Sequence, residues 1–391
     1  MKYIAYYPIY KSLTDSELFP EDRLEQDGLY ATLKRVLRDN GYDIAVNSGE
    51  GVPKADIYIF NRLKDLFPLM YRMLKTRCMH RVIYQQWESA LIDPMHTRRL
   101  MRHWQNIFGG ILTWDDDLVK QGIPYVKSCY MVPRYDAGPR WNVPFEERKL
   151  VTNISGFKHA ASVDGLMELY SWRERFIRFM ESNQMDEFDL YGRGWDAKQF
   201  PSYRGEIDDK LEVLRQYRFS LCFENLTRNN GYVTEKILDC IGAGTIPVYW
   251  GADNITDYIP KECFIDYRDF NDFDRLYRYM RDMPEEVFTA YLKAQQDYLQ
   301  SEAFLKRFTY NAYAEDVLAA IRKTEQNTHY SYPAAWRHFA VVYREVQVPK
   351  KWMALRSRIG NWYRRKICHT TGIPLENKEV QNERRQQESE P

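Results

Sequence analysis

The sequence predicts an α/β fold of two domains in tandem, with a cleft between them. Short apolar runs alternate with longer stretches of helical spacing over residues 1–132, and the same alternation resumes at residue 150. Residues 133–149 lie between the two series and hold three prolines, which is typical of a linker. Strands that alternate with helices usually pair in parallel, so each domain is expected to hold a parallel sheet covered by helices.

The first domain, expected at residues 1–132, begins with the apolar run KYIAYY, which predicts a strand. A helix follows at residues 28–42, and Gly41 is expected to close it, because glycine adopts the left-handed backbone conformation at low cost. The remaining strands of this domain are expected within residues 43–47, 55–61, 80–89, 109–117 and 123–133.

The second domain, expected at residues 150–325, repeats this alternation. Helices are predicted from about residues 164, 208 and 234, between strands predicted within residues 149–155, 188–195, 219–225 and 245–251. Ligands of parallel sheets bind outside the carboxyl ends of the strands. The segments YGRGW, FEN and YWGAD all stand at such ends, so they are expected to line one cleft.

The C-terminal part differs in character. Residues 326–375 are expected to form a basic helical tail, and residues 376–391 are polar and expected to be disordered. Residues 350–368 carry seven Lys or Arg side chains and no acid, while Trp352 and Trp362 fall near one helical face. Two interpretations stay open: a helix packed on the body, or an interfacial helix lying on an anionic membrane.

Composition narrows the classes of function. A formal net charge of +1 gives no overall positive field, which argues against a nucleic-acid-binding protein. No apolar run reaches the roughly 18 residues of a membrane-spanning helix, and the first residues lack the apolar core of a secretion signal. Six cysteines lie apart without a C-x-x-C pair, so free thiols and a cytoplasmic location are expected. Aromatic residues make up 15% of the chain, and such rings often form the walls of carbohydrate sites.

Lys236 stands in the first turn of a predicted helix that begins after Thr234, the expected N-cap. A cation there opposes the helix dipole, whose N-terminus carries about half a positive charge. One interpretation pairs Lys236 with Glu235 or Asp239 at the surface. The other places a diphosphate at the helix start, held by backbone amides, by Lys236 and by an arginine such as Arg193 between its two glycines.

Two acidic segments are candidates for chemistry. The run WDDD, residues 114–117, resembles the D-x-D metal site of many nucleotide-sugar enzymes, but it also fits a helix start, which we favour because aspartate is a common N-cap. Glu88 closes a predicted strand beside Trp87, where loss of water would raise its pKa toward the range of a general base. A solvated strand-end glutamate is the alternative. Neither a P-loop nor a G-x-G-x-x-G motif occurs, and no metal site is expected.

Several spaced segments resemble one known family. YRFSLCFEN, NGYVTEKILDC and AGTIPVYWGADNITDYIPKECFIDYRDF look like the donor-binding core of the α1,3/α1,4-fucosyltransferases, glycosyltransferase family ten. DLYGRGW is similar to the Y-G-R-x-G segment of that family, and the match extends from residue 189 to residue 270. QQWESALIDPMHTR resembles the stretch around the family's catalytic glutamate, with WESA here where the family usually has M-E-S-P.

The resemblance implies a GT-B fold of two Rossmann-like domains and an inverting transfer of L-fucose from GDP-fucose that needs neither a metal nor another cofactor. Glu88 would be the general base. Lys236 and Arg173 would bind the diphosphate, with Arg175 as the alternative to Arg173. The resemblance and the strand-end positions together give the other expected donor-binding residues, which are Arg193, Asn225, Tyr232, Thr234 and Glu235.

The acceptor is expected to be an oligosaccharide or a lipid-linked glycan, bound by the first domain, with an α1,3 linkage to GlcNAc or a related surface-glycan sugar. If residues 350–368 bind an anionic membrane, the enzyme would work at the inner face of the cytoplasmic membrane. Two alternatives remain at this point. The scaffold could transfer another nucleotide-activated sugar, or the protein could be an inactive carbohydrate-binding protein.

Overall fold

The computed structural model describes residues 1–10, 12–19, 28–47, 51–133, 143–160, 162 and 165–346. Residues 1–335 form one compact unit, and residue 336 begins a second, whose described part, residues 336–346, is helical. The predicted basic segment 350–368 and the predicted disordered segment 376–391 lie outside the described residues, as does most of the predicted linker. Within the described part of the chain, no helix is long and apolar enough to cross a membrane.

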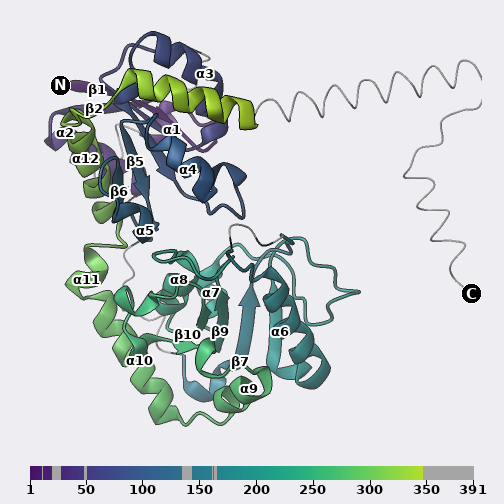
Figure 1. The fold of residues 1–391 in the computed structure, drawn as a ribbon. Coiled ribbons are helices and arrows are strands. Elements are labelled where there is room, and N and C mark those ends of the chain that lie inside the picture. The colour runs from purple at the N-terminus through teal and green to yellow at the C-terminus, as the bar shows by residue number, and fades with distance from the viewer. Residues whose placement is uncertain are drawn as a thin grey trace, which may run out of the picture. The chain divides into compact units, whose positions relative to one another are not determined.

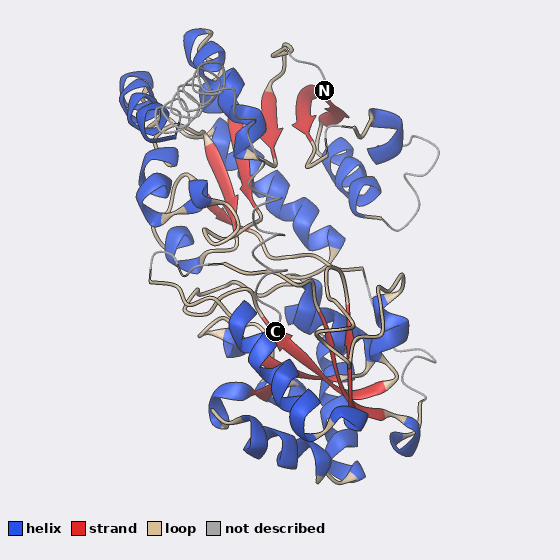
Figure 2. Ribbon diagram, turned by 90° about the vertical axis from the view of Figure 1, so that its right-hand side faces the viewer, coloured by secondary structure: helices blue, strands red, loops and turns tan. Residues whose placement is uncertain are grey.

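The first unit holds two parallel sheets, which Figure 2 shows as two separate sets of red strands. The first sheet has the strand order β2-β1-β3-β4-β5-β6, and each neighbouring pair is parallel. Its strands are β1 (Lys2–Tyr7), β2 (Tyr42–Val46), β3 (Ile57–Phe60), β4 (Val82–Gln86), β5 (Gly110–Thr113) and β6 (Tyr125–Lys127). The connecting helices are α1 (Asp15–Leu18), α2 (Leu29–Asp39), α3 (Leu63–Lys75), α4 (Arg98–Trp104) and α5 (Asp116–Val119).

The second sheet has the order β11-β10-β9-β7-β8 and is also parallel. Its strands are β7 (Lys149–Ile154), β8 (Phe188–Tyr191), β9 (Tyr217–Phe223), β10 (Ile246–Trp250) and β11 (Ile265–Asp266). Its helices are α6 (Tyr170–Asn183), α7 (Lys210–Leu214), α8 (Glu235–Ala243), α9 (Phe273–Arg281), α10 (Glu285–Leu299) and α11 (Glu302–Leu305). The predicted architecture of two parallel-sheet α/β domains is therefore confirmed.

Apolar side chains on both faces of the second sheet explain how its helices are placed. Phe219, Leu221 and Phe223 of β9 pack with apolar residues of α6 and α9, whereas Cys222 of the same strand packs with those of α8 and α10. Successive side chains of a strand point to opposite faces, so both faces of this strand are covered. A strand buried in this way reads as a continuous apolar run, which is the pattern that predicted it.

Helix α12 (Tyr310–Glu325) leaves the second domain and packs against α2 and the first sheet (Figure 1). Val317 and Ile321 belong to the apolar core that Ile4 and Leu33 form in the first domain. The Tyr313 hydroxyl donates to the Gln85 side chain at 2.7 Å. Residues 150–325, expected from the sequence to be one domain, thus divide between both sheets, because the apolar face of α12 covers the first sheet.

The acidic run at residues 114–117 begins a helix and joins the two domains. Asp115 caps α5, and its carboxylate accepts from the amides of Asp117 and Leu118, so the interpretation as a helix start is confirmed. Asp116 accepts from Tyr258 of the second domain at 2.6 Å and from Lys127 at 2.7 Å. This polar cluster holds the first domain against the second beside the cleft.

Gly231 lets a loop of the second domain approach the first domain closely. Its φ is 84°, and a Cβ at this position would lie 2.3 Å from the Trp114 carbonyl oxygen and 2.7 Å from the Lys127 ammonium. Next to it, the Tyr232 ring packs against Trp114 at a centroid distance of 4.7 Å. A side chain at residue 231 would therefore push the two domains apart.

We expect Gly231→Ala to lower the free energy of unfolding by about 1–3 kcal/mol, because the added methyl group overpacks the interface between the domains. Urea unfolding measures this change. Gly41→Ala is the matched control, because Gly41 has a similar φ of 87° and nothing within 4 Å of its Cβ position. If the two variants lose equal stability, backbone strain alone explains the effect and the close approach is unimportant.

Candidate active site

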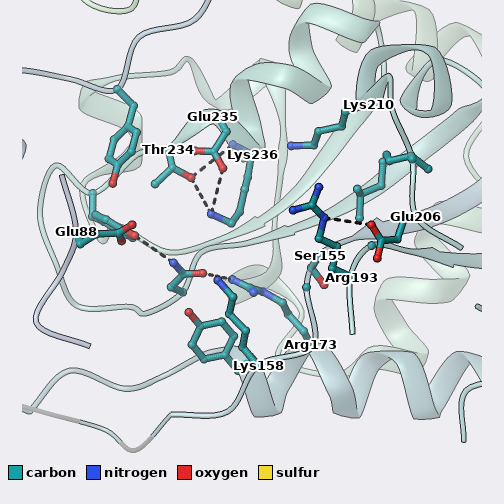
Figure 3. Close-up of a pocket in the computed structure, with 18 residues that line it drawn as sticks. Glu88, Ser155, Lys158, Arg173, Arg193, Glu206, Lys210, Thr234, Glu235 and Lys236 are labelled. Atoms are coloured by element: carbon teal, nitrogen blue, oxygen red, sulfur yellow. Dashed lines mark hydrogen bonds and ion pairs between the residues drawn. The ribbon is translucent and has the colours of Figure 1, made fainter. Parts of the chain in front are cut away.

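A cavity of about 410 Å³ lies between the two domains, at the carboxyl ends of β7, β8 and β9 and at the start of α8 (Figure 3). The first domain contributes Glu88, which follows β4, and Tyr130. All eight residues that the sequence predicted for the site line this cavity, and their roles stay predictions. They are Glu88, Arg173, Arg193, Asn225, Tyr232, Thr234, Glu235 and Lys236. The alternative residue Arg175 is not among the lining residues, and its guanidinium lies over the Trp172 ring.

Helix α8 begins at the cavity. The Thr234 hydroxyl caps it by accepting from the Lys236 amide. The helix ends at Ala243, and Gly244 follows as its C-cap in the left-handed conformation, with a φ of 72°. The first-turn amides and the positive end of the helix dipole therefore lie at the cavity wall, which is the arrangement that binds anions in many proteins.

Lys236 lies between two carboxylates. Its ammonium is 3.2 Å from an oxygen of Glu224 and 3.7 Å from an oxygen of Glu235. Glu224 is fully buried, and the amide and hydroxyl of Thr234 also donate to it, each at 2.8 Å. The sequence suggested Glu235 as a partner for Lys236, but the nearer partner is the buried Glu224.

Arg173, on α6, reaches the same wall from the other side. It is buried, with 4% of its surface exposed. Its Nε donates to the Phe223 carbonyl oxygen, and a terminal nitrogen donates to the Asn225 side chain, each at 3.0 Å. No carboxylate of the described residues forms an ion pair with it. A buried guanidinium without a counter-ion favours binding of an anion from solution.

The carboxylate of Glu88 enters the cavity from the first domain. Its backbone is fixed because the carbonyl of Trp87 accepts from the Trp114 indole at 3.0 Å and from the Tyr130 hydroxyl. The residue is exposed toward the cavity, yet the surrounding protein displaces water from its carboxylate. This desolvation raises the pKa of Glu88, although Lys236 and Lys158 oppose it. A carboxylate with a raised pKa is a stronger base.

Arg193 lies on the loop after β8, where the predicted strand ends early. Gly192 has a φ of 124°, and a Cβ there would come within 2.1 Å of the Ser155 carbonyl oxygen, so the position requires glycine. The Arg193 side chain is 88% exposed and forms an ion pair of 3.2 Å with Glu206. Figure 3 shows this pair at the edge of the cavity.

The sequence reasoning missed two lysines of the cavity. Lys210, the first residue of α7, donates to Asp239 on α8 at 2.8 Å. Lys158 follows β7, and its position after a strand of a parallel sheet was a signal that could have revealed it. For Lys210 we find no such signal. Among the described residues, no three His, Cys, Asp or Glu side chains gather in a way that could hold a metal ion.

The sequence comparisons match fucosyltransferases. Residues 158–351 match the model of the C-terminal domain of glycosyltransferase family 10 (fucosyltransferase). The chain is 46% identical to the α-(1,3)-fucosyltransferase FucT of Helicobacter pylori over 76 residues, which are 19% of this chain and 16% of that protein. It is 26% identical to human α-(1,3)-fucosyltransferase 7 over 251 residues, which are 61% of this chain and 65% of that protein. In both cases the match spans less than two thirds of the relative's length.

Solved structures show the same fold. A crystal structure of an α1,3-fucosyltransferase superposes with a TM-score of 0.51 at 17% identity, covering 85% of this chain and 91% of that chain. HepE of Anabaena superposes with a TM-score of 0.51 at 10% identity, covering 82% of this chain and all of that chain. At these identities the likeness establishes the fold alone, and it is the GT-B arrangement of two α/β domains around a cleft.

Proposed function

Because the chain belongs to glycosyltransferase family 10, the fucosyltransferases, we propose that it transfers L-fucose from GDP-fucose to a hydroxyl group of a glycan. The observation that carries this proposal is the composition of the cavity. A carboxylate of the first domain, Glu88, lines the same space as the start of α8, Lys236 and Arg173 of the second domain. A base on one side of a cavity and anion-binding groups on the other suit the transfer of a sugar from a diphosphate.

In the proposed reaction, Glu88 takes the proton of the acceptor hydroxyl while the hydroxyl oxygen attacks C1 of the fucosyl group. The bond between C1 and the diphosphate oxygen breaks on the opposite face, so the configuration at C1 inverts and no covalent enzyme intermediate forms. The bond electrons leave with GDP. Lys236, Arg173 and the amides of the α8 start stabilise the charge that develops there. No metal or other cofactor is expected to take part.

Five further residues of the cavity wall are proposed to help hold the donor. Tyr232 and Glu235 would contact the ribose and phosphate region. Asn225 and Thr234 would place Arg173 and the start of α8, because they already bond to Arg173 and to the Lys236 amide. Arg193, at the exposed edge, would contribute its charge to donor capture.

The acceptor is proposed to be an oligosaccharide or a lipid-linked glycan, with an α1,3 linkage to GlcNAc or a related sugar. The two relatives reported above are named as α-(1,3)-fucosyltransferases, which supports this linkage.

We further propose a cytoplasmic enzyme that binds the inner face of the membrane through residues 350–368. Seven cations at about 1 kcal/mol each would be ample for peripheral attachment. Co-sedimentation with anionic vesicles of the full chain and of a chain ending near residue 345 tests the attachment.

Mass spectrometry of products tests the proposed function. The purified full chain is incubated with GDP-fucose, other GDP-sugars and UDP-sugars, each against an array of glycan acceptors. We expect the addition of one deoxyhexose, from GDP-fucose only. Efficient transfer from another donor would assign a different nucleotide-sugar transferase on this scaffold. GDP binding without any transfer would favour the inactive carbohydrate-binding protein.

A further inference from the structure

Five cations line the cavity, and four of them already have partners. Arg193 pairs with Glu206, and Lys210 pairs with Asp239. Lys236 pairs with two glutamates, and Arg173 donates to a carbonyl and an amide oxygen. Within the part of the chain that the structure describes, Lys158 is the lining cation for which no ion pair or side-chain hydrogen bond is found. Its ammonium therefore remains available to a ligand.

The loop that carries Lys158 is held firmly beside the cavity. The Ser155 carbonyl accepts from the Trp195 indole at 2.6 Å, and the Phe157 amide donates to the Arg193 carbonyl at 2.9 Å. The Phe157 ring packs against Trp195 at a centroid distance of 4.8 Å and so fixes the residue that precedes Lys158. Only the lysine side chain itself remains to be ordered when a ligand binds, which keeps the entropic cost low.

Lys158 and Arg173 approach the ligand space together. Both line the main cavity, and both line a small recess beside it. Figure 3 shows the amine end of Lys158 reaching into the cavity from the side of Arg173. The ammonium of Lys158 also acts electrostatically on the Glu88 carboxylate. Lys158 therefore lies between the anion-binding wall and the proposed base.

The charge balance shows why a further cation is needed. Lys236 and Arg173 bring two positive charges, but Glu88, Glu224 and Glu235 bring three carboxylates to the same region. Burial raises the pKa of Glu235, but Lys236 and Lys210 outweigh it and the net pKa is lowered, so this carboxylate stays charged at neutral pH. The pairs Arg193–Glu206 and Lys210–Asp239 each cancel in charge. Without Lys158, the remaining groups would therefore present a net negative charge to an incoming diphosphate.

We propose that Lys158 is a third ligand of the donor diphosphate, beside Lys236 and Arg173, and that it supplies the uncompensated positive charge of the site. The inference rests on the proposed function, because it takes a nucleoside diphosphate sugar as the ligand. It also assigns a step in the reaction. The departing nucleoside diphosphate gains about one negative charge as the glycosidic bond breaks, and a lysine that forms no ion pair is free to stabilise that charge.

The experiment compares Lys158→Met, which keeps the apolar stem, with Lys158→Arg, which keeps the charge. GDP affinity is measured by titration calorimetry on the full chain. We expect Lys158→Met to lower GDP affinity by about 10- to 100-fold and Lys158→Arg to retain most of it. Lys198→Met is the matched control, since Lys198 is exposed and does not line the cavity.

A second measurement separates this role from a purely structural one. Lys158 lowers the pKa of Glu88, so its removal should raise that pKa and move the acidic limb of the pH–rate profile to higher pH. The melting temperature should not change, because the side chain has no partner to lose.

Unchanged GDP affinity in Lys158→Met would overturn the inference, and a loss confined to acceptor KM would assign Lys158 to an anionic acceptor group instead. If the wild-type chain binds GDP but transfers another sugar, the donor assignment fails while the Lys158 inference is still decided by the same GDP affinities. If it binds no GDP, both fail.

Discussion

Replacing Glu88 with glutamine is expected to lower the rate of fucosyl transfer by about 100-fold or more, because the amide cannot accept the proton of the acceptor hydroxyl. GDP affinity and the melting temperature should change little, since the side chain is exposed to the cavity and glutamine has the same shape. Steady-state kinetics with GDP-fucose and an acceptor from the glycan array measure the rate.

The pH dependence follows from the same residue. Desolvation raises the pKa of Glu88, and only the deprotonated carboxylate can act as a base. The transfer rate should therefore rise with pH through an acidic limb that lies above the ordinary range of a glutamate, and this limb should disappear in Glu88→Gln.

A near-native rate in Glu88→Gln would show that another group is the base. Glu224, the buried carboxylate that pairs with Lys236, is a poor substitute in this structure. Both of its oxygens accept from Thr234, and one of them also accepts from Lys236 at 3.2 Å. Because Glu224 is also fully buried, it has no path to an acceptor hydroxyl.

Replacing Lys236 with methionine is expected to have two effects. GDP affinity should fall by about 10- to 100-fold, because a charge-assisted contact with phosphate is lost. The free energy of unfolding should fall by about 1–3 kcal/mol, because the buried carboxylate of Glu224 loses its cation. Calorimetry with GDP and urea unfolding measure the two quantities separately.

A second variant distinguishes these two effects. Adding Glu224→Gln to Lys236→Met removes the unpaired buried charge, so stability should recover in part while GDP affinity stays low. If the Lys236→Met variant binds GDP as tightly as the wild type does, Lys236 serves only as the partner of Glu224, and the diphosphate site must lie elsewhere in the cavity.

The sequence alone determined the elements and the region of the site. Apolar runs alternating with helical patterns predicted the two parallel sheets, because strands covered on both faces are apolar throughout. Because ligands bind at the carboxyl ends of such strands, the YGRGW and FEN segments were predicted to line one cleft. An N-cap at Thr234 predicted the start of α8, since capping depends on a few neighbouring residues.

Some boundaries depended on backbone conformations that the sequence pattern did not reveal. The strand predicted within residues 188–195 ends at Tyr191, because Gly192 and Gly194 adopt positive φ angles of 124° and 83°. The helix predicted from residue 164 begins only at Tyr170, after Gly165 with a φ of 75°. Glycine permits both extended and left-handed conformations, so its presence did not decide between them.

Contacts between distant segments were decided by the tertiary structure. The apolar face of α12 indicates that another element covers the helix, but it does not reveal that this element is the first sheet. The charge of Lys236 suggested a nearby acid or an anion, and only the fold brought the buried Glu224 within 3.2 Å. The tertiary structure also decided that Lys158 forms no ion pair among the described residues, because this depends on where each acid of the cavity lies. Local patterns record which side chains prefer burial or a helix end, whereas ion pairs and the charge of a cavity depend on positions that only the packed chain defines.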